Sequence, residues 1–323
     1  MTAALRIISG LALGAGLTAA GWFAARAASP AVRSWRPGAG EVRVAGPLGV
    51  RVFGEGDTVV LLLPGIAATQ VFYGDVYDRL GAHATVVVAD PLGFGDSMVH
   101  GTAGESVSLA THLAALDAAL DELGLGDRPT IAVGHSMGAS LAIQWAATAS
   151  TVRAVVAFDA PLYRTRAEAD ERVAGMGWFE ALMASGPVAE RTCAWVCENR
   201  DSAARLAVAL NPDLPAPIAR AGVRHTWEAY TRSFDALVAG QTWEGALAHL
   251  DERGMPVLLV DGDRDPVPVP GRAVELAERF PSVSARRLPG RHDLPLADPA
   301  ACAGVIEGML LSTDRAARSI QRP

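Results

Sequence analysis

Short apolar runs alternate with longer amphipathic stretches from residue 41 onward. The runs "TVVLLLPG" and "ATVVVADP" are almost continuously apolar, which is typical of parallel strands covered on both faces. The stretch "SLATHLAALDAALDEL" instead repeats leucine at intervals of three and four residues, as one stripe of an amphipathic helix does. Strands that alternate with helices predict a parallel sheet wound on both sides.

Eight strands follow from this pattern. The segments "EVRVAG" and "VRVFGEG" predict an opening pair joined by a tight turn at Pro47 to Gly49. After the two apolar runs, four more strands are predicted in "PTIAVGHS", "VRAVVAFDAP", "MPVLLVDGD" and "VSARRLPG", with helices between most of them. We therefore expect an α/β fold with a mostly parallel eight-stranded sheet and helices on both faces.

A separate apolar segment precedes this core. From Ile7 to Ala25 the chain carries no charge over about 19 residues, or roughly 28 Å as a helix, which matches a bilayer core. This length favours an uncleaved membrane anchor within residues 1–28. Arg6 and the Ala-x-Ala pattern at residues 25–27 also fit a secretory signal peptide, and a buried soluble helix is the third interpretation. The composition of residues 29–40, with its Pro, Gly and Arg, predicts a linker.

The expected localisation is therefore a membrane-anchored or exported protein. Arginines lie on both sides of the apolar run, at Arg6 before it and at Arg26, Arg33 and Arg36 after it. Because the positive-inside rule needs an excess of basic residues on one side, the sequence leaves the side of the membrane open.

Composition narrows the class of protein. The chain has 323 residues, half of them apolar, which is enough for a large buried core. Its formal net charge is −7 and it has no basic patch, which argues against nucleic acid as a partner. Cys193 and Cys197 lie four residues apart, on one helix face, and Cys302 stands alone. No further Cys or His cluster completes a metal site, so we interpret the cysteines as structural and leave a Cys193–Cys197 bond open.

The pentapeptide "GHSMG" places Ser136 between Gly134 and Gly138, after a predicted strand and before a predicted helix. Glycine is needed there if the turn is so sharp that a Cβ would collide with neighbouring backbone. At these residues the chain resembles the α/β-hydrolase family, whose nucleophile elbow has the pattern G-x-S-x-G. The competing interpretation is a serine that caps an ordinary helix.

The resemblance implies a catalytic triad in the order serine, acid, histidine. It assigns the acid to Asp265, because family loops read G-x-x-D and this loop has Gly262 three residues earlier. Asp263 is the reserve candidate, and Asp159, at the end of an earlier strand, is a third. The base is His292 in "RLPGRHDLPLADP", although Arg291 stands where the family usually has glycine. His135 is expected to pack beneath the serine.

The resemblance also implies two donors for the oxyanion of an acyl-transfer reaction. One is the backbone N–H of Met137, and the other is the N–H of Ile66, where Gly65 lets the backbone approach the substrate. "DPLGFGDS" matches a further family stretch, which we interpret as structural. No metal or organic cofactor is required.

The family commonly carries a helical cap inserted after strand six. Here the α/β-hydrolase core would comprise residues 41–161 and 255–311, the cap residues 162–254, and a C-terminal tail residues 312–323. The cap region is rich in large apolar residues, and we expect Trp178, Phe179 and Trp227, with Gly65, to contact substrate.

Together these features predict a serine hydrolase that cleaves a small hydrophobic carboxylic ester through an acyl-enzyme at Ser136. Hydrolysis of a C–C bond next to a ketone, of a thioester or of an amide, and cofactor-free haloperoxidase or perhydrolase chemistry, use the same residues. A serine in place of aspartate argues against dehalogenase and epoxide-hydrolase chemistry. A ligand receptor on this fold and a membrane-anchored interaction protein are the non-enzymatic alternatives. The substrate and the oligomeric state do not follow from the sequence.

Overall fold

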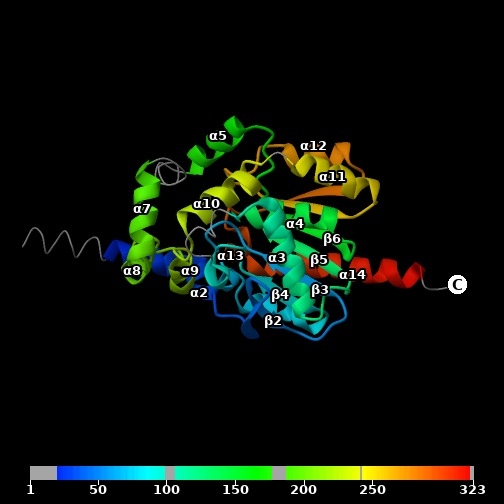
Figure 1. Ribbon diagram of the computed structural model, residues 1–323, viewed down its shortest axis with the longest axis horizontal. Helices are drawn as coiled ribbons and strands as arrows, with labels where there is room; N and C mark the ends of the chain where they lie inside the picture. The colour runs from blue at the N-terminus through cyan, green and yellow to red at the C-terminus, as the bar shows by residue number, and fades with distance from the viewer. Residues whose placement is uncertain (1–19, 99–105, 177–186, 241, 321–323) are drawn as a thin grey trace, which may run out of the picture.

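The computed structural model of the protein describes residues 20–98, 106–176, 187–240 and 242–320 (Figure 1). Its strands form an eight-stranded sheet in the order β1-β2-β4-β3-β5-β6-β7-β8. They are β1 (Glu41–Ala45), β2 (Leu48–Phe53), β3 (Val59–Leu63), β4 (Thr85–Ala89), β5 (Thr130–His135), β6 (Val152–Phe158), β7 (Val257–Gly262) and β8 (Val283–Leu288).

The pairing confirms the expected mostly parallel sheet. β2 is antiparallel to both β1 and β4, whereas every pair from β4 across to β8 is parallel. The opening turn is one residue earlier than predicted: Ala45 pairs with Leu48, so Gly46 and Pro47 form the turn. Gly46 has a φ of 53°, which glycine adopts without strain, and this favours the turn at that position.

Helices connect the parallel strands. Between β3 and β6 lie η1 (Gln70–Phe72), η2 (Asp75–Ala82), η3 (Gly95–Ser97), α3 (Leu109–Glu122) and α4 (Met137–Thr148). An insertion between β6 and β7 contains α5 (Arg166–Met176), α7 (Pro187–Glu198), α8 (Arg200–Leu210), α9 (Ala216–Ala221), α10 (Trp227–Ser233), the π-helix η5 (Phe234–Val238) and α11 (Trp243–Glu252). The remaining helices are α12 (Arg272–Arg279), α13 (Leu294–Ala297) and α14 (Pro299–Ile320).

Both faces of the sheet are buried, which explains the continuous apolar runs. In β3, Leu61 and Leu63 point to the face covered by α3, α4, α11 and α12. Val60 and Leu62 point to the opposite face, which η2, α13 and α14 cover. Because successive side chains of a strand point to opposite faces, a strand covered on both sides needs apolar residues at every position.

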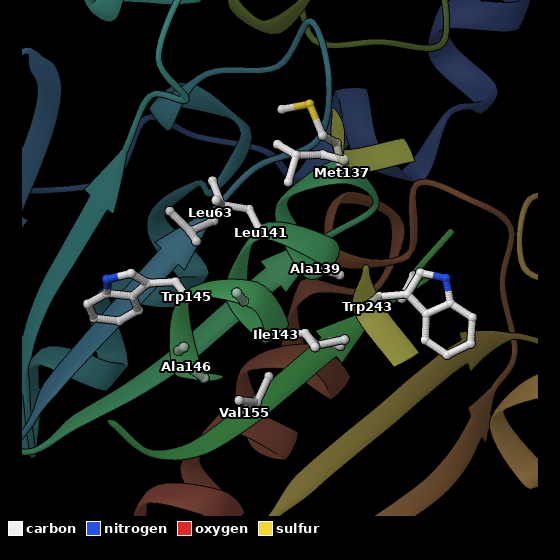
Figure 2. Close-up of a cluster of buried hydrophobic side chains, with 14 of the residues drawn as sticks. Leu63, Met137, Ala139, Leu141, Ile143, Trp145, Ala146, Val155 and Trp243 are labelled. Atoms are coloured by element: carbon white, nitrogen blue, oxygen red, sulfur yellow. The ribbon is translucent and has the colours of Figure 1, made fainter. Parts of the chain in front are cut away.

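Helix α4 is enclosed on all sides (Figure 2). Every residue from Met137 to Ala146 is buried, and the indole N–H of Trp145 donates to Asp117 at 2.8 Å. Figure 2 shows α4 with Trp145 on one side and Trp243 of α11 on the other. This packing holds the N-terminus of α4, where Ser136 lies, in a fixed position.

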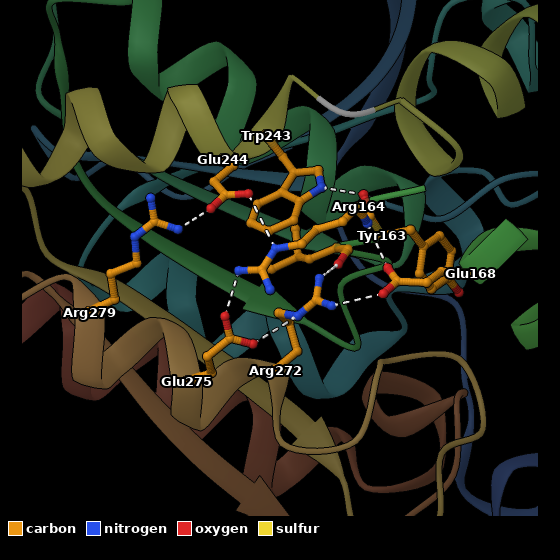
Figure 3. Close-up of polar contacts among 9 residues, drawn as sticks. Tyr163, Arg164, Glu168, Trp243, Glu244, Arg272, Glu275 and Arg279 are labelled. Carbon is orange, nitrogen blue, oxygen red and sulfur yellow. Dashed lines mark hydrogen bonds and ion pairs between the residues drawn. The ribbon is translucent and has the colours of Figure 1, made fainter. Parts of the chain in front are cut away.

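A network of arginine and glutamate side chains joins the segment after β6 to α11 and α12 (Figure 3). Arg164 pairs with Glu244 of α11 at 3.3 Å and with Glu275 of α12 at 2.5 Å, and Arg279 also pairs with Glu244. Isolated surface ion pairs add little stability, about 0–1 kcal/mol, but shared partners restrict the relative positions of all three segments.

The same segment supports the loop after β7. The guanidinium of Arg272 donates to the carbonyl oxygen of Leu162 at 2.6 Å, and the indole of Trp243 donates to that of Tyr163 at 2.7 Å. The Tyr163 hydroxyl then donates to the carbonyl oxygen of Val267 at 2.9 Å. The loop that carries Asp265 is therefore held from the side of the insertion.

The termini differ from expectation in part. Residues 20–28 are helical and are followed by α2 (Pro30–Ser34), so a short helix replaces the start of the expected linker. Residues 7–19 of the predicted anchor lie outside the described residues. Within the described ranges, no helix combines the length and apolar character needed to cross a bilayer. At the other end, α14 is helical to Ile320, beyond the predicted start of the tail at residue 312.

Candidate active site

Ser136 stands at the turn between β5 and α4 in a conformation that non-glycine residues rarely adopt. Its φ is 53° and its ψ is −122°, and its side chain makes no capping hydrogen bond to α4. The two glycines are required because a side chain at either position would collide with the backbone. A Cβ on Gly134 would lie 2.0 Å from the carbonyl oxygen of Gly138, and a Cβ on Gly138 would lie 2.3 Å from the carbonyl oxygen of Leu63. The turn is therefore a strained elbow and not an ordinary helix cap.

The structure brings the three expected triad residues into one hydrogen-bonded chain. His292 Nε2 lies 3.0 Å from Ser136 Oγ, and His292 Nδ1 lies 2.9 Å from Asp265 Oδ2. The side chain of Asp265 is fully buried, whereas that of His292 is 22% exposed. The residues follow three parallel strands, β5, β7 and β8, whose carboxyl ends meet at one edge of the sheet.

Asp265 is held as a carboxylate. Burial opposes its ionisation, but the hydrogen bond and charge of His292, together with the backbone N–H of Val267 at 2.8 Å, hold the pKa of Asp265 below its ordinary value. Asp263, the reserve candidate, is exposed and accepts a hydrogen bond from the N–H of Gly290 at 2.8 Å. It fixes the loop before His292 and does not contact the imidazole.

Asp159 lies fully buried directly after β6. Its Oδ1 accepts the N–H of Gly262 at 2.8 Å, while its Oδ2 has no hydrogen-bond partner among the residues that the structure describes and lies 3.8 Å from His135 Nε2. Burial and, next, the charge of Asp265 raise the pKa of Asp159 to about 10. The third candidate acid is therefore protonated at neutral pH.

His135 packs beneath the triad. It is 5% exposed and stacks on Phe72 with ring centroids 5.0 Å apart. Its Nε2 lies 2.5 Å from the carbonyl oxygen of His292, and because a carbonyl only accepts, this nitrogen carries the proton. Burial first, and then the charge of His292, lower the pKa of His135 to about 3, so the ring is neutral and orients the His292 backbone.

His135, Asp159 and His292 also form the group of potential metal ligands within the described ranges, with ligand atoms within 4.8 Å of one another. Both ring nitrogens of His292 are already engaged, by Ser136 and Asp265, and His135 Nε2 is engaged by a carbonyl oxygen. The hydrogen bonds of the triad therefore account for this cluster.

The two expected oxyanion donors belong to segments next to the serine. A Cβ on Gly65 would lie 3.2 Å from the Cβ of Ser136, so the loop after β3 packs directly against the nucleophile. Met137 is the first residue of α4, where N–H groups have no acceptor within the helix. Neither the N–H of Ile66 nor that of Met137 donates a hydrogen bond to another group of the described chain. Both are free to bind a ligand oxygen.

Backbone strain is concentrated at this edge of the sheet. In the described residues, the non-glycine positions with positive φ are Ala67 at 55°, Ser136 at 53° and Asp159 at 52°. They directly follow or lie close after β3, β5 and β6. Each such residue costs about 1–3 kcal/mol, and such strain clusters at functional sites. Nothing in the sequence marks Ala67, whose strain is visible only in the backbone.

The insertion contains a cavity of about 260 Å³ between α7 and the α9–α10 segment. Its wall touches the loop of Ile66, because a Cβ on Gly222 would lie 3.2 Å from the carbonyl oxygen of Ala67. His225 also pairs with Phe94, in the loop after β4. The lining is mostly apolar: Ala189, Thr192, Cys193, Val196, Gly222, Val223, His225, Trp227 and Tyr230.

Of the residues expected to contact substrate, Trp227 lines this cavity, and Trp178 and Phe179 lie outside the described residues. His225 and Tyr230 also line the cavity but were not among the residues expected to contact substrate, although the aromatic residues of "RHTWEAY" were a usable signal. All three cysteines are free thiols. The thiol of Cys197 donates to the carbonyl oxygen of His225 at 3.4 Å, so the Cys193–Cys197 pair is not a disulfide.

Two buried histidines are each expected to lower the unfolding free energy of the protein in acid. Burial lowers the pKa of His112 from 6.5 to about 4, and that of His135 to about 3. Between pH 6.5 and about 4 the unfolded chain therefore binds protons at these two histidines that the folded protein does not bind, so their contribution to stability falls as the pH drops through this range. At pH 5 each histidine costs ~2 kcal/mol of unfolding free energy.

The measurement is urea unfolding of the wild type and of His112→Asn at neutral pH and at pH 5. We choose His112 because it bonds Ser233 and lies outside the triad. Asparagine does not titrate, so the loss of stability between the two pH values should shrink by ~2 kcal/mol. An unchanged pH dependence would contradict the assignment of a neutral, buried imidazole.

Comparisons with known proteins find solved structures of the same fold. The haloalkane dehalogenase DbeA from Bradyrhizobium elkani is 19% identical, with a TM-score of 0.63 over 85% of this chain and 98% of that chain. A thermophilic esterase from Thermogutta terrifontis is 19% identical, with a TM-score of 0.58 over 82% of this chain and 93% of that chain. A bacterial membrane phospholipase A, described as a virulence factor, is 19% identical, with a TM-score of 0.57 over 96% and 98%.

At such identities these structures show a shared fold alone. A comparison with curated protein sequences finds no significant match. The sequence profile of the alpha/beta hydrolase fold, however, matches residues 58–296, a range that runs from β3 to beyond His292. Because this match covers most of the chain and includes the elbow and the triad, the protein belongs to the alpha/beta hydrolase fold family.

Proposed function

We propose that the protein is a serine hydrolase that cleaves carboxylic esters with an apolar acyl or alcohol part. One observation supports this proposal above all: the hydrogen-bond chain from Asp265 through His292 to Ser136, at 2.9 and 3.0 Å. A serine hydroxyl is a weak nucleophile unless a neighbouring base takes its proton. His292 Nε2 is placed to do so, and Asp265 holds the ring through Nδ1–H.

In the proposed reaction, Ser136 Oγ attacks the ester carbonyl carbon while its proton passes to His292 Nε2. Asp265 stabilises the imidazolium, and the N–H groups of Ile66 and Met137 stabilise the oxyanion, at about 3 kcal/mol for one such donor. The tetrahedral intermediate expels the alcohol, which takes the proton from His292 and leaves the acyl group on Ser136. A water then attacks the carbonyl carbon of the acyl-enzyme while it gives its proton to His292 Nε2. The second tetrahedral intermediate releases the acid as the bond to Ser136 Oγ breaks and Oγ takes that proton back.

The residue at position 136 separates this proposal from dehalogenation. An alkyl-enzyme ester requires a carboxylate nucleophile, whereas this chain has a hydroxyl at position 136. The names of the esterase and of the phospholipase A are those of ester hydrolases, which agrees with the proposed cleavage of an ester.

The cavity of the insertion supports an apolar substrate. Its lining includes the rings of Trp227 and Tyr230 and the side chain of Val196, beside the loop of Ile66. Ligand sites are typically apolar hollows with a few polar groups near the reacting bond. In the proposal the insertion acts as the cap, and the cavity takes the apolar part of the ester while the carbonyl group lies at Ser136.

The test is hydrolysis of p-nitrophenyl esters from acetate to dodecanoate by the full chain. Activity with an optimum at an intermediate or long acyl chain would support the proposal. A folded protein that is inert on the whole series would overturn ester hydrolysis. Thioester, amide and 1,3-diketone substrates, assayed in the same way, would then identify which bond the triad cleaves.

We expect Val196→Phe to shorten the preferred acyl chain. Val196 is half-buried in the cavity wall, and a phenyl ring there would occupy space that the chain of the substrate needs. The ratio of kcat/KM for octanoate to that for acetate should fall by ~10-fold or more, as expected when two or more methylene groups lose their burial. The acetate rate should stay close to that of the wild type.

Ala194→Phe is the matched control, because Ala194 lies two residues earlier on α7 and is exposed. It adds the same ring to the same helix outside the cavity, so the chain-length profile should not change. An equal shift in both variants, or in neither, would show that the cavity does not hold the substrate chain.

A further inference from the structure

The N-terminal helix is fastened to helix α8 at one end of the molecule (Figure 1). The indole N–H of Trp22 donates to the carbonyl oxygen of Ala209 at 2.9 Å, and the Ser29 hydroxyl donates to that of Asp213 at 2.7 Å. Carbonyl groups in the last turn of a helix and just after it lack partners within the helix, so these bonds satisfy the C-terminal end of α8. The segment from Trp22 to Ser29 is therefore fixed beside the C-terminal end of α8.

Three large apolar side chains are exposed at this junction, and we call them the apolar face: Phe23 is 66% exposed, Leu206 46% and Leu210 60%. Leu206 and Leu210 lie one helical turn apart, so they share one side of α8. Ala209, which binds Trp22, lies between them in the chain, and Phe23 follows Trp22 directly. Large exposed apolar residues on two helices that are bonded to each other are candidates for an interaction surface.

The charges around the apolar face are basic on balance. Residues 20–40 contain Arg26, Arg33 and Arg36 and no Asp or Glu, whereas residues 199–214, which include α8, contain two arginines and two aspartates. The two segments together carry a formal charge of +3 in a chain whose net charge is −7. Within the described chain, none of these three arginines forms an ion pair with a carboxylate. At the surface of a bilayer, basic residues can bind the anionic headgroups while neighbouring apolar residues enter the layer of acyl chains.

A second copy of the chain fits this surface less well. In a two-fold dimer each patch meets itself, so a surface with an excess of arginine would face a second surface with the same excess. The sequence immediately before Ala20 points the same way, because residues 7–19 are uncharged and mostly apolar. The chain upstream of the apolar face is thus suited to lipid.

We propose that the apolar face formed by Phe23, Leu206 and Leu210 lies on the surface of an anionic lipid bilayer. Helix α8 then lies along the interface, with its leucines among the acyl chains and Arg26, Arg33 and Arg36 near the headgroups. The insertion that contains the cavity is the part of the fold next to the membrane. This docking does not depend on hydrolysis, so it can fail or succeed independently of the proposed function.

The test uses the full chain in vesicles of phosphatidylcholine and phosphatidylglycerol that contain a lipid with a diazirine in its acyl chain. After illumination, lipid cross-links are located by mass spectrometry. We expect cross-links at Phe23, Leu206 and Leu210. Val274 of α12 and Leu311 of α14 are internal controls, because they are 52% and 45% exposed but lie on other elements, and they should show background labelling.

The variant Leu206→Glu/Leu210→Glu should lose the Phe23 cross-link to the level of Val274, while circular dichroism shows an unchanged fold. Equal labelling of the apolar face and of Val274 would overturn the proposal, since it would mean that no face is oriented toward lipid. A protein that sediments as a dimer and becomes a monomer in Leu206→Glu/Leu210→Glu, without lipid cross-links, would also overturn it and identify a dimer interface.

Discussion

Ser136→Ala should reduce kcat for ester hydrolysis by ~10⁶-fold, because the side chain that attacks the carbonyl is gone. The Oγ that lies 3.0 Å from His292 Nε2 is the only atom of Ser136 that the substitution removes. Alanine keeps the backbone strain at φ 53°, so we expect the unfolding free energy to change little. The measurement is kcat and KM for the best p-nitrophenyl ester, with urea unfolding of the same preparation.

Ser140→Ala is the matched control for this experiment. Ser140 is a buried serine on the same helix, 2% exposed, and its hydroxyl has no hydrogen-bond partner among the described residues. Its removal should leave kcat unchanged. Comparable losses in both variants would show that disruption of α4, and not the loss of a nucleophile, explains the effect of Ser136→Ala. Full activity of Ser136→Ala would place the nucleophile elsewhere.

Asp265→Asn should lower kcat/KM by ~10⁴-fold with an intact fold. The carboxylate accepts the Nδ1–H of His292, whereas the amide can present an N–H there and stabilise the tautomer in which Nε2 carries the proton. With Nε2 protonated, His292 cannot accept the proton of Ser136. The imidazolium also loses the buried negative charge that stabilises it. Single-turnover kinetics would locate the loss in acylation.

Asp159→Asn is the comparison that separates the two buried acids. Because Asp159 is protonated at neutral pH, an amide is close to it in charge and shape, and its Oδ1 can still accept the N–H of Gly262. We expect kcat/KM within the same order of magnitude as the wild type. A loss as large as that of Asp265→Asn would mean that the two carboxyl groups act as one unit and that Asp159 shares the role of the acid.

The local part of the fold could be predicted because it depends on residues near one another in the chain. The two-sided burial of β3 is visible as the run "TVVLLLPG", and the need for Gly134 and Gly138 is visible in the spacing of the elbow. The opening turn was displaced by one residue because Gly46 and Pro47 form a tighter connection than the predicted Pro47 to Gly49.

The three candidate acids show which features of the site follow from the sequence and which follow only from the structure. The sequence offers Asp159, Asp263 and Asp265 at the ends of strands, and only a family resemblance favours Asp265. In three dimensions the distances and the burial distinguish them: Asp265 contacts His292, Asp263 bonds Gly290, and Asp159 is buried and protonated. Differences in pKa of this kind arise from neighbours distant in the chain and cannot be read from composition.

By itself the sequence determined the class of fold, the position of the elbow and the residue types available for chemistry, because these depend on local apolar periodicity and on short motifs. Only the tertiary structure decided which acid meets His292, where the cavity lies beside the loop of Ile66, and that Trp22 binds α8. Such contacts join residues far apart in the chain, and their distances depend on how the whole sheet and its helices pack.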